Sequence, residues 1–447
     1  MIELNKHFMT QADSAVHDRT HFTDSNALVE VLDGDEFNTN PPPQVREPVI
    51  RIPGEGIVSS YDLNLRMLST HLLILGGIGT GKTNTFYHLI SGASKMMGPS
   101  DAMIIFDTKG DFLTFQRQGD VVIGNGSNSC GPTGEDYWNI FREIDPERKT
   151  ESIRELCRSL FKENLENTSN SYFPNAACDL MAALMTICYD ALGKDANNRQ
   201  FLNFINSSTT ADFIQILNRD TCYRSVINHI SDPNSGQSQG VVAEMNSVIN
   251  KVFIGNFAKV GTLSLRELVA RRQGRRIFIE YDIEAGEVLT PIYNLMFDMA
   301  IKKALSERSG GGGSVFFFVD EFKLLPHLSH IDDAVNFGRS LGVKMCIGLQ
   351  SITQMYDNYG ESRSKSILSG FLNNLFFRVN NKESRDYIKE YYGQRVERIR
   401  YDMQGGIGYH LITTDVIKDK DITRLEQGEA IVASPDFEPY VFRFSKF

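Results

Sequence analysis

Short apolar runs recur along most of this chain, and segments with helical spacing separate them. The first run, at residues 71–75, is followed from residue 83 by a helical pattern. Fully apolar strands that alternate with helices are typical of a parallel sheet covered on both faces, so the pattern predicts an α/β fold with a mostly parallel central sheet. The further strands predicted are 103–106, 121–123, 276–281, 315–319, 344–349, 375–379, 430–433 and 440–444, and the helices predicted are 286–306, 331–341 and 382–392.

One long stretch breaks this alternation. Between residues 146 and 258 no strand pattern intervenes. We therefore predict an all-α subdomain at 146–258, inserted between two parts of the main domain at 71–145 and 259–447. Its clearest helical segments are 152–161, 175–192, 210–218 and 240–253.

Residues 1–70 differ from the rest. The first 40 are polar and lean acidic, and Pro41, Pro42 and Pro43 then favour an extended backbone. We predict an N-terminal arm without a transmembrane helix.

The overall composition is that of a soluble globular protein. Of the 447 residues, 41% are hydrophobic and 23% are charged. The six cysteines form no C-x-x-C pair and are typical of reduced cytosolic thiols. There is no signal pattern, and no apolar run approaches the ~18–20 residues that span a bilayer. We expect a cytoplasmic protein without a direct membrane span, or one held peripherally at the inner membrane by a partner.

The most informative motif is GGIGTGKT, which begins at Gly76 and matches the phosphate-binding pattern G-x-x-x-x-G-K-[ST]. A strand is predicted before it and a helix after it, which is the context that such a loop requires. Backbone N–H groups of the loop and the start of the helix would then face a polyphosphate. Lys82 would neutralise the β- and γ-phosphates, and the Thr83 hydroxyl would hold Mg²⁺. The nucleotide-binding residues predicted are Gly76, Gly77, Ile78, Gly79, Thr80, Gly81, Lys82, Thr83 and Asn84.

A second motif, SVFFFVDEF at residues 314–322, is an apolar strand that ends in two carboxylates. The carboxyl ends of parallel strands are where open α/β folds bind ligands. Asp320 would join the Mg²⁺ shell, and Glu321 would orient and deprotonate the attacking water. The alternative is that the strand ends in an ordinary acidic turn with no catalytic role. The presence of the phosphate-binding motif favours the catalytic interpretation.

Two further residues come from GRSLGVKMCIGLQSITQ, at residues 338–354. Gln350 ends the strand that follows Asp320 and Glu321, so it would lie beside the γ-phosphate if the two strands are neighbours. Its amide could there bond both phosphate and water and so act as a sensor of the bound nucleotide. Arg339 stands near the end of the preceding helix and could act across a subunit boundary as an arginine finger. A fourth motif, IIFDTKGDF, places Asp107 and Lys109 at the end of another strand, where they could equally form a simple turn.

Three further clusters of residues could be functional, but each also has an ordinary structural explanation. The arginines at 271, 272, 275 and 276 could line a DNA-facing channel, although such clusters are more often solvated turns. A net charge of −10 argues against a protein that coats nucleic acid with its whole surface, but leaves room for a basic channel inside a ring. Arg395, Arg398 and Arg400 lie among tyrosines, as in single-strand binders. His327, His330 and Asp332 have metal-like spacing without an evident fourth ligand.

Taken in order, the motifs GGIGTGKT, FDTKGDF, VDEF and GRSLGVKMCIGLQSITQ resemble those of the conjugative type IV coupling proteins, the TraD/TraG-like branch of the FtsK/HerA superfamily of P-loop motor ATPases. YWNIF at 137–141, LSLREL at 263–268 and DITRLEQGEAIV at 421–432 are lesser matches. The resemblance implies a RecA-like motor domain with an inserted all-α subdomain that closes into a hexameric ring. It also implies ATP and Mg²⁺ as ligands, with Lys82, Thr83, Asp320, Glu321, Gln350 and Arg339 in the roles given above. Coupling proteins usually open with transmembrane helices, and polar residues stand in their place here.

The first functional hypothesis is therefore an ATP-hydrolysing DNA motor, acting on single- or double-stranded DNA with a relaxase, a nuclease or a membrane anchor as partner. A second is a cytosolic ATPase that moves protein cargo or serves a partner nuclease. A third is a ring scaffold that ATP assembles but that hardly turns over. DNA-stimulated turnover separates the first from the second, and a Glu321→Gln variant with full biological activity would favour the third.

Overall fold

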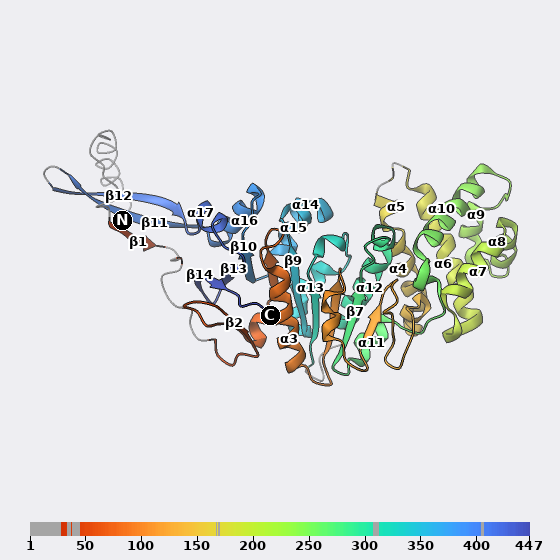
Figure 1. The fold of residues 1–447 in the computed structure, drawn as a ribbon. Helices are drawn as coiled ribbons and strands as arrows, with labels where there is room; N and C mark the ends of the chain where they lie inside the picture. Colours follow the sequence, from red (N-terminus) through yellow and green to blue (C-terminus); the bar gives the residue numbers. More distant parts are fainter. Residues whose placement is uncertain are drawn as a thin grey trace.

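The centre of the molecule is a large sheet that runs across the middle of Figure 1. The computed structural model describes residues 28–33, 37, 45–166, 168, 170–306, 313–403 and 406–447. In this part of the chain the sheet has nine strands in the order β14-β13-β10-β4-β9-β8-β5-β7-β6. The strands from β10 to β6 are parallel, and β13 and β14 add antiparallel at one end. Their bounds are β4 Leu72–Leu75, β5 Ala102–Asp107, β6 Val121–Ile123, β7 Arg275–Glu280, β8 Val315–Val319, β9 Val343–Leu349, β10 Asn373–Phe377, β13 Glu429–Ser434 and β14 Phe437–Arg443.

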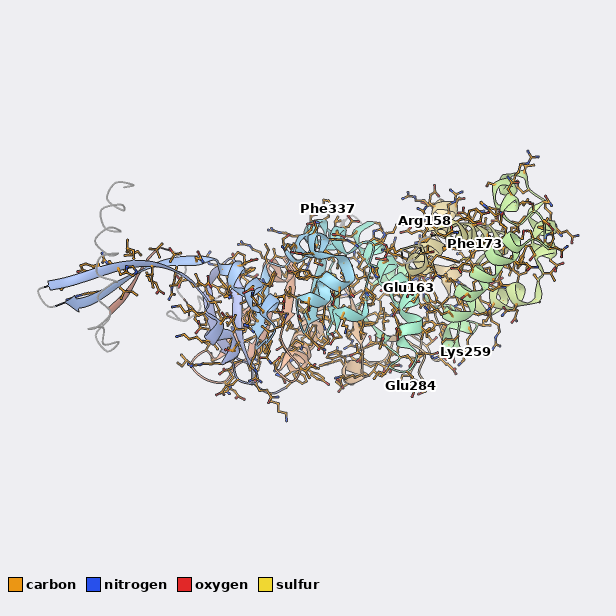
Figure 2. All side chains as sticks on the ribbon, turned by 90° about the horizontal axis from the view of Figure 1, so that it is seen from above. Arg158, Glu163, Phe173, Lys259, Glu284 and Phe337 are labelled. Carbon is orange, nitrogen blue, oxygen red and sulfur yellow. The ribbon has the colours of Figure 1, made fainter. Side chains whose placement is uncertain are left out.

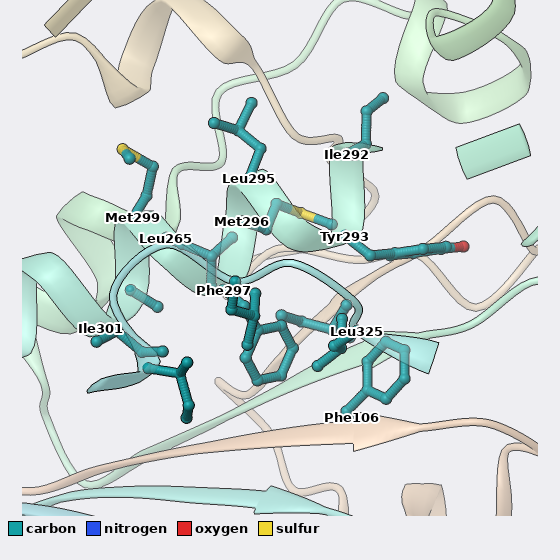
Figure 3. Packing of buried hydrophobic residues seen from close by; sticks show 14 of the residues in the cluster. Phe106, Leu265, Ile292, Tyr293, Leu295, Met296, Phe297, Met299, Ile301 and Leu325 are labelled. Carbon is teal, nitrogen blue, oxygen red and sulfur yellow. The ribbon is translucent and has the colours of Figure 1, made fainter. Parts of the chain in front are cut away.

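Each face of this sheet has its own hydrophobic core, because successive residues of a strand point to opposite faces. In β4, Leu73 and Leu75 belong to one cluster, whereas Leu72 and Ile74 belong to the other. Helix α12 (Gly286–Ser306) covers the first face, where its Tyr293 and Phe297 rings contact Phe106 of β5 at centroid distances of 5.9 and 5.5 Å (Figure 3). Helix α3 (Lys82–Met96) covers the second face. The predicted α/β fold with a mostly parallel sheet is confirmed.

The stretch from 146 to 258 contains helices and no strand among its described residues. Helices α4 and α10 pack against α12, so the apolar core of this helical segment is continuous with that of the sheet. In Figure 1 the segment occupies the end of the molecule opposite to β11 and β12. Its helices are α4 Lys149–Leu160, α5 Lys162–Glu166, α6 Tyr172–Leu192, α7 Asn198–Ser207, α8 Thr210–Leu217, α9 Arg224–His229 and α10 Gly236–Val252.

Helix α6 is the one helix among the described residues that is long and apolar enough to cross a membrane. Length and composition alone are weak evidence, because the core helix of a soluble domain passes the same test. Leu180, Met181, Leu184 and Met185 of α6 are fully buried in the first core.

Two short motifs meet around the buried Glu143 side chain. The Glu143 carboxylate accepts hydrogen bonds from Trp138 Nε1 (2.8 Å), Ser264 Oγ (3.0 Å) and the backbone N–H of Leu265 (2.7 Å). Asn139 Nδ2 adds a bond to the carbonyl of Gly261. The YWNIF and LSLREL motifs are therefore joined to each other near the two ends of the helical segment, and α11 (Leu265–Arg271) begins at this contact.

The described part of the predicted N-terminal arm is mostly packed structure. Strands β2 (Ile50–Pro53) and β3 (Ser60–Leu63) form a hairpin whose Ile50, Ile52 and Tyr61 side chains are buried beside α3. A Cβ at Gly92 of α3 would lie 2.6 Å from Ile50, so the glycine allows close packing. Residues 45–69, including α2 (Leu65–Ser69), thus differ from a free arm, because their apolar residues complete the second core. Pro41, Pro42 and Pro43 lie outside the described residues.

A second, three-stranded sheet projects from the molecule and was missed by the sequence pattern (Figure 1). It consists of β1 (Leu28–Asp33), β11 (Gln394–Met403) and β12 (Gly406–Asp415), all antiparallel. In β11, apolar residues alternate with polar or charged ones only over residues 399–403, so the strand lacks the fully apolar run that marks the central strands. The remaining helices are α13 Ile331–Leu341, α14 Thr353–Tyr359, α15 Glu361–Leu368, α16 Lys382–Tyr392 and α17 Asp419–Thr423.

Candidate nucleotide site

The glycine-rich loop lies between β4 and α3, at the carboxyl edge of the central sheet. Gly79 (φ 72°) and Gly81 (φ 117°) adopt left-handed conformations that other residues rarely tolerate. A Cβ at Gly76 would lie 2.4 Å from Phe377 Cβ, so this position also requires glycine. Since all four residues of β4 are buried, the loop is held on a rigid support.

Lys82 is the first residue of α3, and its side chain folds back over the loop. Its ammonium donates hydrogen bonds to the carbonyls of Gly76 (2.7 Å) and Gly77 (3.0 Å). Burial lowers the pKa of Lys82, and the carboxylates of Asp320 and Glu321 oppose this effect. The loop therefore contains a buried cation beside the free N–H groups of a helix N-terminus, which is an environment suited to anions.

Thr83 and Asp320 meet across β9, which lies between β4 and β8 in the sheet. Thr83 Oγ1 donates a hydrogen bond to Asp320 Oδ2 at 2.8 Å. The other oxygen of this carboxylate, Oδ1, is buried and has no hydrogen-bond partner among the described residues. Burial raises the pKa of Asp320 to about 6. A hydroxyl beside a carboxylate with an unused oxygen is a donor set that fits Mg²⁺.

Gly348 makes this approach possible, and sequence reasoning missed it. It lies in β9 between the two strands, and a Cβ there would come 2.1 Å from the carbonyl oxygen of Asp320. A glycine inside an otherwise apolar strand signals close approach of another backbone, and this signal was present in the sequence.

Glu321 and Gln350 form the second polar pair of the site. Gln350 Nε2 donates to Glu321 Oε2 at 2.5 Å, and Gln350 N donates to Gln354 Oε1 at 3.0 Å. Strands β8 and β9 are parallel neighbours, as the placement of Gln350 required. Glu321 Oε1 is buried and has no partner among the described residues, so this carboxylate keeps an oxygen available for a further donor.

The other predicted loop residues have different environments. Ile78 is 85% exposed at the tip of the loop, whereas Thr80 is buried and donates through Oγ1 to the Gly77 carbonyl at 2.9 Å. Gly428 N donates to the Thr80 carbonyl at 2.9 Å, which ties the loop to the start of β13. The Asn84 side chain bonds to residues that follow β14 rather than to the loop.

Arg339 is the predicted residue that the structure does not bring to the others. It lies in the last turn of α13, whereas Gln350 follows the far end of β9. The residues of β9 span ~20 Å at about 3.3 Å per residue, so Arg339 lies near the opposite edge of the sheet. Its side chain is exposed, and no described residue bonds to it. Within one chain it is not part of the site.

The structure shows the contacts of several residues that the sequence had suggested only weakly as functional. Arg276 is buried and forms an ion pair with Asp120 at 2.8 Å, so it is not available to line a channel. Arg272 is also buried and donates to the Ser100 carbonyl at 3.2 Å. Asp107 accepts hydrogen bonds from the N–H groups of Phe112 (2.8 Å) and Lys109 (3.3 Å), as a turn-forming residue does.

The basic cluster at 395–400 lies on β11 of the projecting sheet. Arg395 pairs with Glu397 of the same strand at 2.6 Å. Arg398 lies over the Tyr409 ring at 5.3 Å. Arg395 and Arg398 therefore have partners within the sheet.

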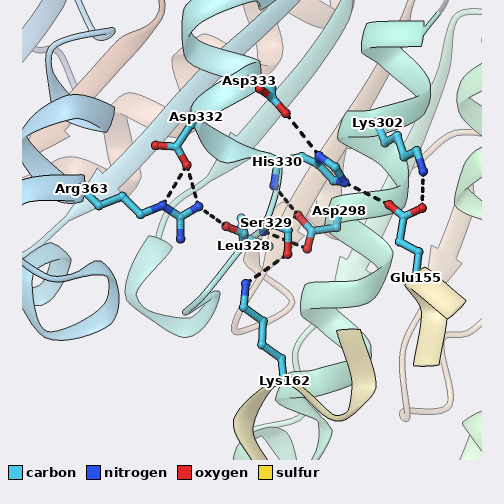
Figure 4. A network of polar contacts seen from close by, with 10 residues as sticks. All are labelled: Glu155, Lys162, Asp298, Lys302, Leu328, Ser329, His330, Asp332, Asp333 and Arg363. Atoms are coloured by element: carbon cyan, nitrogen blue, oxygen red, sulfur yellow. Dashed lines mark hydrogen bonds and ion pairs between the residues drawn. The ribbon is translucent and has the colours of Figure 1, made fainter. Parts of the chain in front are cut away.

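A polar network joins the residues that follow Glu321 to the helical segment (Figure 4). The Asp298 carboxylate of α12 accepts from the N–H groups of Ser329 (2.9 Å) and His330 (3.0 Å). Lys162 of α5 donates to the His327 carbonyl at 2.5 Å, and His330 Nε2 lies 3.1 Å from Glu155 Oε1 of α4. His327, His330 and Asp332, once considered for their metal-like spacing, are thus bonded to Glu166, Glu155 and Arg363 respectively.

The geometry is accompanied by a family match. Residues 57–437 match the family described as the type IV secretion-system coupling protein DNA-binding domain. The chain belongs to this family. The predicted coupling-protein resemblance is thereby confirmed.

Comparisons with individual coupling proteins agree with this family assignment. Coupling protein TraD of Escherichia coli strain K12 is 25% identical over 167 residues, which cover 37% of this chain and only 23% of TraD. Among solved structures, the bacterial conjugative coupling protein TrwBdeltaN70 in its unbound monoclinic form superposes with a TM-score of 0.75, 18% identity and 90% of each chain covered. TrwB in complex with ADP and Mg²⁺ gives a TM-score of 0.70 at 17% identity, over 86% of this chain and 87% of that one. At these identities the structures establish the fold, which is the RecA-like P-loop fold.

Proposed function

We propose that this chain is an ATP-hydrolysing DNA motor of the coupling-protein type. The observation that carries the proposal is the 2.8 Å hydrogen bond between Thr83 and Asp320, which joins the phosphate loop to the acidic end of β8. A buried lysine, a hydroxyl and two carboxylates with unused oxygens at one helix N-terminus fit a magnesium nucleotide.

Each group has a proposed role. The loop from Gly76 to Asn84 binds the phosphate chain through its backbone N–H groups, and Lys82 offsets its negative charge. Thr83 and Asp320 hold Mg²⁺, which when bound screens the charge of the phosphates. Glu321 orients the attacking water and accepts its proton, and Gln350 holds the Glu321 carboxylate in place.

The proposed assembly is a homo-oligomeric ring, with a hexamer as the expected size. Since Arg339 lies far from the Gln350 of its own chain, it serves as the arginine finger for a neighbouring copy. The proposed substrate is single- or double-stranded DNA, and the proposed partners are a relaxase, a nuclease or a membrane anchor. The ring works in the cytoplasm or at the inner membrane through such a partner.

The direct test is steady-state ATP turnover with and without single- and double-stranded DNA, beside a mass measurement of the oligomer. We expect Mg²⁺-dependent turnover that DNA increases, from a particle larger than a monomer. Turnover that ignores both kinds of DNA would favour protein cargo, and absence of ATP binding at millimolar concentration would overturn the proposal.

A further inference from the structure

The turn that follows β5 carries a second lysine to the edge of the sheet where the phosphate loop lies. Strands β5 and β8 are parallel neighbours and Phe106 lies opposite Val319, so Asp107 and Asp320 leave the sheet at the same edge. Lys109 stands two residues beyond Asp107. The strand order β4-β9-β8-β5 therefore places the carboxylates that follow β8 between the phosphate loop and the turn of Lys109.

The backbone of this turn is held in place from two sides. Asp107 is fully buried, and its carboxylate accepts hydrogen bonds from the N–H groups of Phe112 (2.8 Å) and Lys109 (3.3 Å). The Tyr87 hydroxyl of α3 donates to the Asp111 carbonyl at 3.0 Å. The turn is thus fixed against the same helix that begins at the phosphate loop.

The side chain of Lys109 is exposed, and no described residue forms a hydrogen bond or ion pair with its ammonium. Lys109 borders a cavity of about 280 Å³ together with Glu280 and Asp282. These two acids have neutral partners, because Asn128 Nδ2 donates to Glu280 Oε1 at 2.9 Å and Asn125 Nδ2 donates to Asp282 Oδ2 at 2.8 Å. The Lys109 ammonium is therefore available to a ligand.

The positive charge of Lys109 acts on the nucleotide site. Burial is the main cause of the lowered pKa of Lys82, and the charge of Lys109 contributes to the lowering. Burial raises the pKa of Asp320 to about 6, and Lys109 opposes this rise together with Thr83 and Lys82. Because charge interactions weaken with distance, these effects indicate that the Lys109 ammonium lies near both groups.

A bound triphosphate requires more positive charge than Lys82 supplies. The γ-phosphate and its metal belong with Asp320 and Glu321, whose carboxylates are themselves negative. Mg²⁺ offsets only part of the charge of the phosphates, and Arg339 of the same chain lies near the opposite edge of the sheet. Lys109 is a second cation on the γ-phosphate side of the site.

We propose that Lys109 binds the γ-phosphate of the nucleotide, with the carboxylates of β8 lying between it and the phosphate loop. This inference rests on the proposed nucleotide site. A lysine ammonium is a compact charge with three donors, so it can contact phosphate oxygens without a fixed geometry. Since ADP lacks the γ-phosphate, Lys109 makes the site favour ATP over ADP.

The test compares nucleotides with and without the γ-phosphate. Dissociation constants are measured in the presence of Mg²⁺ for a non-hydrolysable ATP analogue and for ADP, on the full chain and on Lys109→Ala. Loss of a charge-assisted contact predicts about tenfold weaker binding of the ATP analogue and unchanged binding of ADP. Lys109→Arg keeps the charge and should restore most of the difference between the two ligands. Lys323→Ala, at an exposed lysine of η9 (Phe322–Leu324) close to Glu321, is the matched control and should leave both constants unchanged.

The Glu280 carboxylate is another place that could hold the Lys109 ammonium, since its Oε2 atom has no partner among the described residues. A lysine that served this carboxylate would affect the two ligands alike or not at all. Unchanged affinity for the ATP analogue in Lys109→Ala, or equal weakening of the analogue and ADP, overturns the inference while leaving the phosphate loop intact. Failure of the unaltered chain to bind either ligand would instead overturn the proposed function.

Discussion

The two edges of the central sheet differ in what they collect. At the carboxyl edge, Thr83 meets Asp320 at 2.8 Å and Gln350 meets Glu321 at 2.5 Å. Near the amino edge, Arg339 stands exposed, and no described residue bonds to it. The difference shows that the candidate site gathers at one edge of the sheet, and that Arg339 of the same chain is not part of it.

The largest effect is expected from removing the lysine at the carboxyl edge. Lys82→Ala should abolish ATP binding or turnover, because the loop loses the charge that offsets the phosphates. Isothermal titration and a phosphate-release assay measure the two effects. Lys95→Ala, an exposed lysine in the last turn of the same helix, is the matched control and should behave as the unaltered chain.

The amino edge is tested by Arg339→Ala, which should lower turnover by about 10³-fold or more if the guanidinium stabilises charge on a neighbour's γ-phosphate. Mixing this variant with Lys82→Ala should restore part of the activity, since mixed rings contain sites with an intact loop and an intact arginine. Arg158→Ala, an exposed arginine of α4 shown in Figure 2, is the control. Unchanged turnover in Arg339→Ala would show that the arginine is not at a working interface.

Glu321→Gln separates binding from chemistry at the carboxyl edge. The amide cannot accept the proton of the attacking water, so turnover should fall by about 10²–10⁴-fold while ATP affinity is retained. Equilibrium binding and single-turnover hydrolysis provide the measurements. A parallel loss of affinity would indicate that Glu321 helps to hold Mg²⁺ instead.

The smallest expected effect concerns the network between β8 and the helical segment. The pKa of His330 is raised, chiefly by Glu155 of α4, with Asp298 of α12 and Asp333 of α13 adding to the effect. The stabilisation by protonated His330 is complete below its ordinary pKa of 6.5 and is lost as pH rises through the raised value. His330→Gln should therefore lower the thermal midpoint by about 1–2 °C at pH 6 and by less at pH 8.5. Equal shifts at both pH values would exclude a charged contribution.

Much of the fold could be predicted from the sequence because burial on both faces leaves a simple signal. Strand β8 and helices α12, α13 and α16 have the predicted bounds, and β10 begins and ends two residues earlier than predicted. The projecting sheet was missed because polar or charged residues are interspersed among the apolar ones in β11 and β12, so no fully apolar run marks these strands. The hairpin of β2 and β3 was missed because each of its strands has only two clearly apolar residues, whereas β4, of the same length, is apolar throughout.

The candidate site was less complete in prediction than the fold. The order of the motifs predicted that Lys82, Thr83, Asp320, Glu321 and Gln350 lie together, because each follows the end of a predicted strand. The close approach at Gly348 was signalled by a glycine inside an apolar strand but was not used. The bonds from Asn84 to residues more than 350 positions away had no signal in the sequence. Such contacts depend on strand order, which a single sequence does not encode locally. The roles proposed for the site residues, and the domain boundaries, stay predictions.

The attachment of the projecting sheet has a mechanical consequence. The Gly77 N–H bonds to the carbonyl of Arg378, which directly follows β10, and the same chain continues through α16 into β11. Arg385 and Lys389 of α16 pair with Asp419 of α17, so the base of the hairpin is braced on both sides. Each of its ten-residue strands is ~33 Å long. A rotation of 5° at that base, on the order of a small helix adjustment, would sweep the tip through about 3 Å. A small movement at the glycine loop would therefore become a larger movement at the tip of the hairpin.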